Sequence, residues 1–125
     1  MQPMTPSEVV QRQLDAYNAR DLGAWAATYA PDARQTDLRG GLLAEGRAQI
    51  RERMVLRFAE PDLHAELLSR IVMGNVVVDH ERITRNFPEG RGTVEMICVY
   101  EVQGDWIQHA SFALAATRVL LEKAT

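Results

Sequence analysis

The chain has 125 residues, of which 46% are hydrophobic and 25% charged, and its formal net charge is -3. This length fits one domain with a buried core, and no apolar run approaches the roughly 18 residues that a membrane span needs. Basic and acidic residues are interleaved, which excludes the electropositive surface that nucleic-acid binding requires. We therefore predict a single domain over residues 1–125 with no nucleic-acid or membrane partner.

The N-terminal residues and the cysteine content indicate a compartment. The first residues lack the basic stretch and the apolar run of a signal peptide. Cys98 is the single cysteine, so it cannot form an internal disulfide, and this fits a reducing environment. We expect the protein to be cytoplasmic.

Two helices are predicted at the start of the chain. Thr5 and Glu8 flank Pro6 as in a capping box, so the first helix should begin near Pro6. Its apolar positions recur at helical spacing through Tyr17. Asp21 is placed to cap a second, shorter helix, which the pair at 31–32 should end.

An extended segment and a third helix follow. Residues 33–38 have an extended pattern, and the sequence Arg-Gly-Gly at 39–41 predicts a turn. The third helix should begin at Gly46 and close at 60–62. Three helices thus precede a region of a different pattern.

From about residue 63 the pattern changes to β-branched residues and punctuated turns. It predicts four strands, at 67–73, 76–86, 93–102 and 106 to about 119. The connections between them are of hairpin size, so consecutive strands should be antiparallel. A doubly wound α/β fold is thereby disfavoured, and an α+β fold is predicted.

Alternation along the strands predicts which face is buried. In residues 94–102 the even-numbered side chains are apolar and should face inward, and the even set of the last strand is likewise the more apolar. The strand at 76–84 has no clean parity. The pattern therefore leaves the orientation of Asp79, His80 and Glu81 open.

Several strings, in their order and spacing, resemble a known family. They are Ala19-Arg20-Asp21-Leu22, Tyr29-Ala30-Pro31-Asp32-Ala33, Glu45-Gly46-Arg47 with Ile50, and Gly104-Asp105-Trp106-Ile107. Over nearly its whole length the chain resembles the ketosteroid isomerase and SnoaL-like polyketide cyclase branch of the nuclear-transport-factor-2-like superfamily. The resemblance implies N-terminal helices packed on a strongly curved, mostly antiparallel sheet that encloses a conical pocket. It also implies a homodimer formed through the outer sheet face.

Asp37 is the catalytic candidate that the resemblance implies. In ketosteroid isomerases a carboxylate just after the second helix shuttles a proton between two carbons, and Asp37 falls at that place. Such a carboxylate needs an apolar pocket mouth, where desolvation raises its pKa enough to abstract and return a proton. The alternative is a solvated Asp that heads the turn into Gly40 and Gly41.

The isomerases also place two hydrogen-bond donors where negative charge develops on the substrate oxygen. These are a Tyr on the first helix and a protonated Asp on the penultimate strand, and the matching positions here are Gln13, with Tyr17 one turn later, and Cys98. The Gln13 amide is able to donate, but Cys98 is a weak donor. We therefore expect a relative that keeps the pocket and changes the chemistry, rather than a steroid isomerase.

His80 is the second catalytic candidate, because a neutral imidazole serves as base or acid near pH 7. Strand alternation puts Asp79 and Glu81 on one face and His80 on the other, so either His80 or the acidic pair lines the cavity. The alternative is a structural role for His80 in a cross-strand ion pair. His64 and His109 are expected to pair with no carboxylate.

No motif points to a metal or cofactor. The three His residues lack ligand spacing, the serines lack the Gly-x-Ser-x-Gly elbow, and the Gly-Arg-Gly string lies in a hairpin. Cys98 sits in the middle of a strand, where burial would raise the pKa of its thiol and keep it inert. An apolar lining with a few hydroxyls is expected from Tyr17, Tyr29, Met54, Phe58, Tyr100 and Phe112.

These observations lead to two hypotheses. The first is a cofactor-independent enzyme that transfers a proton on a small hydrophobic carbonyl or polycyclic compound. In it Asp37 is the base, and Tyr17, Gln13 or His80 give polar support. The alternative is a non-catalytic module for binding a small ligand or for dimerisation, which the missing oxyanion donors favour.

Overall fold

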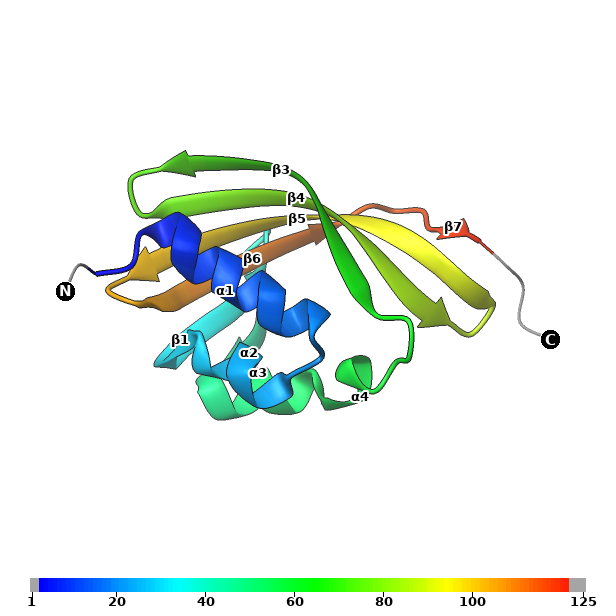
Figure 1. The fold of residues 1–125 in the computed structure, drawn as a ribbon, viewed down its shortest axis with the longest axis horizontal. Coiled ribbons are helices and arrows are strands. Elements are labelled where there is room, and N and C mark those ends of the chain that lie inside the picture. Colours follow the sequence, from blue (N-terminus) through cyan, green and yellow to red (C-terminus); the bar gives the residue numbers. More distant parts are fainter. Residues whose placement is uncertain (1–2, 122–125) are drawn as a thin grey trace.

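Helices lie against one face of a long, curved sheet (Figure 1). The computed structural model describes residues 3–121, so residues 1–2 and 122–125 of the predicted domain lie outside the described residues. The helices are α1 Pro6–Asn18, α2 Leu22–Ala27, α3 Arg47–Arg53 and α4 Val55–Phe58. The strands are β1 Tyr29–Asp37, β2 Leu42–Glu45, β3 His64–Met73, β4 Val76–Phe87, β5 Gly90–Gln103, β6 Trp106–Leu114 and β7 Val119–Leu120. The fold is α+β, as expected.

Helix α1 begins where its capping box predicts. The Thr5 hydroxyl accepts a hydrogen bond from the Glu8 backbone N–H at 3.2 Å, and the Glu8 carboxylate accepts one from the Thr5 N–H at 2.9 Å. Two of the unpaired N–H groups of the first turn are thereby satisfied. The helix buries one stripe, which comprises Val9, Val10, Gln13, Leu14 and Tyr17.

Helix α2 is shorter than the sequence predicts, because β1 begins sooner. Asp21 caps α2 as expected, accepting from the Ala24 N–H at 3.0 Å, but the helix ends at Ala27. Tyr29 already pairs with Ile107 of β6, and the pair Pro31 and Asp32 lies inside β1. The pairing is irregular between residues 29 and 34, which is where a strand tolerates a Pro without an N–H.

The third predicted helix is divided into α3 and α4. Gly46, with a φ of 85°, starts α3 in a backbone conformation that favours glycine. Met54, at φ -105° and ψ 0°, then interrupts the helical backbone before α4. Ile50, Met54 and Phe58 are nevertheless all buried, so both short helices cover the same core.

The strands form one sheet in the order β2-β1-β6-β5-β4-β3, and β7 pairs with β5. The neighbours are antiparallel except β1 and β6, which are parallel. Strand β2, which the sequence analysis missed, follows the turn after β1. The predicted last strand stops at Leu114, and β7 folds back as a separate strand onto the start of β5.

Alternation on β5 is confirmed, and on β6 it holds only in part. Cys98, Tyr100 and Val102 are all buried, as their even positions predict. A register shift between residues 101 and 102 then changes the pairing with β6. As a result Ile107 is fully buried, whereas Trp106 is 46% exposed.

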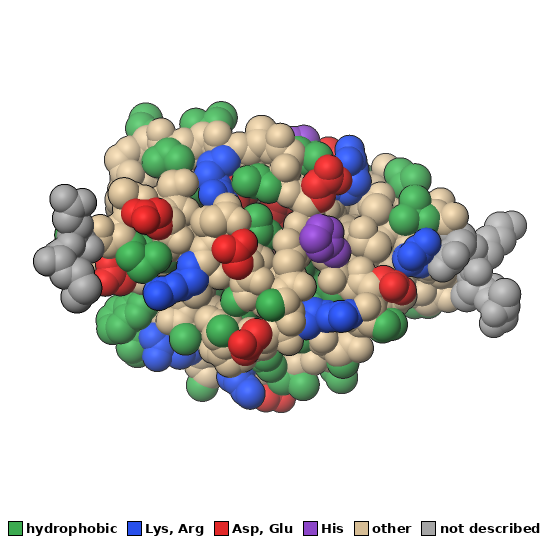
Figure 2. All heavy atoms as spheres, in the orientation of Figure 1, with side chains coloured by type: hydrophobic (Ala, Val, Ile, Leu, Met, Phe, Trp, Pro, Cys, Tyr) green, Lys and Arg blue, Asp and Glu red, His purple; other side chains and the backbone are tan. Residues whose placement is uncertain are grey.

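The outer surface carries charges of both signs. Figure 2 shows acidic and basic side chains interspersed over the face that Figure 1 presents. None of the helices in the described part of the chain has the length and apolar character that crossing a membrane requires.

Candidate functional site

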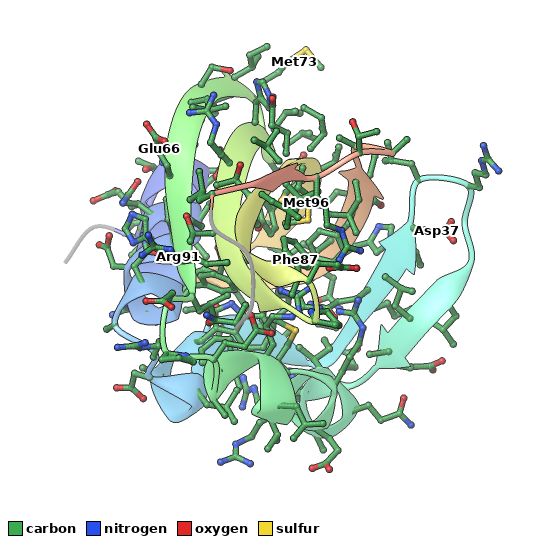
Figure 3. All side chains as sticks on the ribbon, turned by 90° about the vertical axis from the view of Figure 1, so that its right-hand side faces the viewer. Asp37, Glu66, Met73, Phe87, Arg91 and Met96 are labelled. Carbon is green, nitrogen blue, oxygen red and sulfur yellow. The ribbon has the colours of Figure 1, made fainter. Side chains whose placement is uncertain are left out.

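A cavity of about 380 Å³ lies between the helices and the concave face of the sheet. Figure 3 looks toward the end of the sheet where β4 and β5 turn, with Met96 and Phe87 near the centre of the view. Both residues line the cavity, together with Ile83, Val94 and Phe112. The volume is in the range of small-molecule sites, and these side chains offer an apolar surface.

Most of the predicted lining residues do meet at this cavity. They are Gln13, Tyr17, Tyr29, Asp37, Met54, Tyr100 and Phe112. Phe58 and Cys98 are buried outside the lining, and the Phe58 ring packs at 5.3 Å from the rings of both Tyr17 and Trp25. Helices and sheet thus bring together residues as far apart in sequence as Gln13 and Phe112.

Asp37 lies at one side of the cavity, at the end of β1 where the turn to β2 begins (Figure 3). Its Oδ1 atom accepts hydrogen bonds from the backbone N–H groups of Arg39 at 2.8 Å and Gly41 at 3.0 Å. The carboxylate therefore organises the hairpin that its own strand enters. The alternative interpretation placed Asp37 at the head of a turn into Gly40 and Gly41, and the structure contains that turn.

His80 lies on the opposite face of the sheet from the cavity lining and is not brought together with Asp37. Its Nε2 atom is 2.6 Å from Oε1 of Glu95 on the neighbouring strand, and both side chains are partly exposed. His109 is also on the outer face, where its Nδ1 atom lies 2.9 Å from Glu101. The expectation that His109 has no carboxylate partner is therefore wrong.

Glu81 is the acidic residue that reaches the cavity. The odd-numbered residues of β4 from Val77 to Ile83 are all buried, so this is the inner face of the strand. Asp79 and Glu81 lie between those two apolar residues, and Glu81 lines the cavity with only 3% of its surface exposed. Within residues 3–121 its buried Oε2 atom has no hydrogen-bond partner.

The pKa of Glu81 is raised from 4.5 to about 7. Burial is the largest cause, because it penalises the charged carboxylate, and the negative charge of Asp79 adds to it. The positive charge of Arg70 and a hydrogen bond with Cys98 oppose the shift. Glu81 therefore exchanges its proton near neutral pH.

Cys98 and Tyr100 connect Glu81 to helix α1. The Cys98 thiol interacts with both the Glu81 carboxyl group and the Tyr100 hydroxyl. The Tyr100 hydroxyl in turn donates to Oε1 of Gln13 at 3.4 Å. Burial raises the pKa of the Cys98 thiol well above its usual range, so it stays protonated. Gln13 and Cys98, the two positions matched to the isomerase donors, thus belong to one series of polar contacts that ends at Glu81.

Trp25 places a second unpaired polar atom beside the cavity. Its ring is 2% exposed and packs at 5.1 Å from the Tyr29 ring. Trp25 lines the cavity, and its Nε1 atom is buried without a hydrogen-bond partner in the part of the chain that the structure describes. A buried indole N–H usually has an acceptor, so Trp25 brings an unsatisfied donor to the wall of the cavity.

Gln35 and two tyrosines complete the polar lining. Gln35 donates from Nε2 to the Tyr29 hydroxyl at 3.2 Å and accepts from Arg53 at 3.0 Å. Burial raises the pKa of Tyr17 to about 12, although the nearby charge of Arg57 opposes the shift. Burial also raises the pKa of Tyr29. Both hydroxyls are therefore protonated at neutral pH.

Sequence reasoning left Glu81 undecided and missed Trp25, Gln35 and Arg53 as lining residues. For Glu81 the sequence did hold a signal. Val77 and Ile83 are apolar and odd-numbered like Glu81, so alternation places all three on one buried face of the strand. Two acidic residues in the middle of such a face indicate a functional position. Nothing local marks the other three. Within residues 3–121, no group of three or more His, Cys, Asp or Glu side chains gathers closely enough to hold a metal ion.

A comparison with known protein families identifies the family of this chain. A profile described as the SnoaL-like domain matches residues 10–110. The chain belongs to the SnoaL-like family. No curated protein shows a significant match to this SnoaL-like chain.

Solved structures share the fold of this SnoaL-like domain. An uncharacterized cystatin-fold protein from Novosphingobium aromaticivorans is 26% identical, with a TM-score of 0.81 over 88% of this chain and 98% of that one. A hypothetical protein from Catenulispora acidiphila, with a ketosteroid isomerase-like fold and solved with trimethylamine, is 20% identical, with a TM-score of 0.79 over 96% and 94%. A putative polyketide cyclase from Sinorhizobium meliloti is 24% identical, with a TM-score of 0.68 over 84% and 93%.

Proposed function

We propose that this SnoaL-like domain is a cofactor-independent enzyme that moves a proton on a small, largely apolar carbonyl compound, with Glu81 as the acid and base. One observation carries the proposal. A carboxyl group inside a cavity of about 380 Å³ is 3% exposed, has a pKa of about 7, and leaves its Oε2 atom unpaired among the described residues. A general base is most effective when its pKa lies near the working pH.

The proton-transfer step uses atoms that the cavity provides. The Glu81 carboxylate accepts a proton from a carbon beside the carbonyl, and the C–H electron pair moves into the adjacent carbon–carbon bond. The carbonyl π pair moves onto oxygen, which accepts a hydrogen bond from Nε1 of Trp25. The enolate carbon–carbon pair then takes the proton back from the Glu81 carboxylic acid as the oxygen pair re-forms the carbonyl. The proton returns to the same carbon or, where a further carbon–carbon double bond is conjugated with the enolate, to the far carbon of that bond. The indole N–H takes the role of the second donor, which Cys98 is poorly suited to fill.

This proposal moves the catalytic role from Asp37 to Glu81. The Oδ1 atom of Asp37 is occupied by two backbone N–H groups of its own turn, and the side chain is partly exposed. Among residues 3–121 Glu81 has no such partner on Oε2, and it lies deeper. Asp37 remains the sequence-based hypothesis, and the two carboxylates are distinguishable by experiment.

The test measures proton exchange directly, because no substrate needs to be known. Bicyclic and aromatic ketones such as 2-tetralone are incubated with the protein in D₂O, and ¹H NMR follows the loss of the protons beside the carbonyl above the spontaneous rate. We expect Glu81→Gln to lower the catalysed rate by about 10²–10⁴-fold and Asp37→Asn to leave it within about threefold. The rate should rise with pH through about pH 7 as Glu81 ionises.

Other results decide against Glu81. A large loss in Asp37→Asn with normal exchange in Glu81→Gln would restore the sequence-based assignment. Equal exchange in the wild type and both variants would end the enzymatic proposal.

A non-catalytic ligand-binding module is the second candidate. It is favoured by the strand position matched to an isomerase donor, because Cys98 at that position is a weak donor. In that case an apolar ligand should bind the wild type and Glu81→Gln equally and be recovered chemically unchanged.

A further inference from the structure

Arginine side chains from four separate segments of the chain line this largely apolar cavity. Three belong to helices α3 and α4 and strand β4, and the fourth lies just before β7. No local sequence motif gathers them, since they are spread over more than sixty residues. They are Arg53, Arg57, Arg85 and Arg118.

Three of these arginines have carboxylate partners. Arg85 binds Glu60 with two nitrogen atoms, at 2.6 and 3.3 Å, and Arg57 approaches the same carboxylate at 3.6 Å. Arg118 lies 3.2 Å from Glu89. Their positive charges are thus shared with acids that belong to the protein itself.

Arg53 differs from the other three. No ion pair joins it to a carboxylate in the described part of the chain, and its Nη1 atom donates a hydrogen bond to the neutral amide oxygen of Gln35 at 3.0 Å. Arg53 is exposed on α3, whereas Gln35 is only 1% exposed, so the guanidinium reaches from the surface toward the interior. Four of its five N–H donors remain available, in a planar arrangement that suits a carboxylate.

The balance of charge around the cavity indicates how many negative charges a ligand should carry. Four guanidinium groups face three carboxylates, those of Glu60 and Glu89 and that of Asp37 in the lining. Among the described residues, Arg53 is the one of these four arginines without a carboxylate partner, so one positive charge at the cavity is left to pair with a ligand. A single carboxylate compensates it, whereas a phosphate dianion would exceed it.

We propose that the ligand of this cavity is an apolar carbonyl compound with one carboxylate, which Arg53 binds at the cavity mouth. The apolar body then lies against Ile83, Met96 and Phe112. Binding of this compound by Arg53 does not depend on the proposed function. Only the statement that the bound compound is also a substrate rests on that function. An apolar carboxylic acid with no reactive carbon should bind equally well.

The test compares two probes of the same ring system and similar shape, the anionic 2-naphthoate and the neutral 2-naphthamide. Isothermal titration calorimetry at about pH 6 keeps the naphthoate ionised. The wild type should bind naphthoate at least about tenfold more tightly than naphthamide. Arg53→Met should remove that preference, and Arg53→Lys should keep part of it, since an ammonium retains the charge without the planar fork.

Arg51→Met is the matched control, because Arg51 is exposed on the same helix and does not line the cavity. It should bind both probes as the wild type does. Glu81→Gln should bind naphthoate like the wild type even if it is inactive, so a failure of the proposed reaction is separable from a failure of this proposal.

Three results would overturn the proposal. The first is equal affinity of the wild type for naphthoate and naphthamide, and the second is an unchanged preference in Arg53→Met. The third is the absence of naphthoate binding at about 1 mM. If Arg53→Met does not fold, the preference of the wild type and its reduction in Arg53→Lys decide the question.

Discussion

Two carboxylates two residues apart on the same face of β4 have opposite surroundings. Asp79 is fully buried and pairs with Arg70 through two hydrogen bonds of 2.7 and 2.9 Å. Glu81 is 3% exposed, yet its Oε2 atom has no partner among the described residues. Burial alone therefore does not decide the role of a carboxyl group. Whether a cation lies within reach of it decides that role.

The register of β3 produces this difference. Arg70 lies directly opposite Asp79, whereas the residue opposite Glu81 is Leu67. A register shift between residues 67 and 69 separates these two pairs. One acid thus receives a cation and a structural role, and the other receives an apolar neighbour and a raised pKa.

The largest expected effect on stability comes from breaking the ion pair between Asp79 and Arg70. Asp79→Ala leaves the Arg70 guanidinium, 13% exposed, without its carboxylate, so we expect a loss of about 3–5 kcal/mol in the free energy of unfolding. Urea titration measures it. Glu66→Gln is the control, since it breaks the exposed pair with Arg82 and should cost less than about 1 kcal/mol. A loss at Asp79 no larger than at Glu66 would contradict the structural role.

The second prediction concerns how the stability of the protein depends on pH through Glu81, the carboxyl group without a cation partner. The folded pKa of Glu81 lies above its unfolded value, so the folded state holds the proton more tightly and ionisation costs stability. This cost is absent below about pH 4.5, grows as the pH rises to about 7, and then stays near 3 kcal/mol. Glu81→Gln should equal the wild type at about pH 4 and exceed it at about pH 8.

Urea unfolding of both proteins at the two pH values measures this difference. Glu66→Gln, which alters an exposed side chain, should show no comparable change with pH. A constant difference between Glu81→Gln and the wild type at both values would show that Glu81 does not titrate near neutrality.

A smaller effect is expected at Trp25. Trp25→Phe keeps the aromatic contacts with Tyr29 and Phe58 but removes the N–H, so proton exchange on ketones should slow by about tenfold with little change in stability. The control is Trp106→Phe, because Trp106 is 46% exposed and does not line the cavity. Equal rates in the two variants would remove Trp25 from the mechanism.

The smallest effect should follow a change at His80. His80→Gln removes a partly exposed contact with Glu95 on the outer face, so stability should change by less than about 1 kcal/mol. Exchange activity should stay within about twofold of the wild type, because the side chain is outside the cavity. A larger loss of activity would bring His80 back as a catalytic candidate.

Local interactions made part of this protein predictable. The capping box of Thr5 and Glu8 set the start of α1, because its hydrogen bonds join residues three positions apart. Alternation predicted the buried face of Cys98 and Tyr100, since the period of a strand is a local property. The family resemblance, which the profile match confirms, came from several such local strings in their order.

The tertiary structure decided the rest. The orientation of Glu81, the pairing of Asp79 with Arg70 and the turn around Asp37 depend on how strands are registered and where hairpins close. The meeting of Trp25 and Arg53 at one cavity depends on helices that are distant in sequence. A sequence specifies hydrogen bonds between near neighbours and the period of its apolar residues. Solvent exposure, pKa and ligand geometry instead arise from contacts between distant segments, so they exist only once the chain has packed.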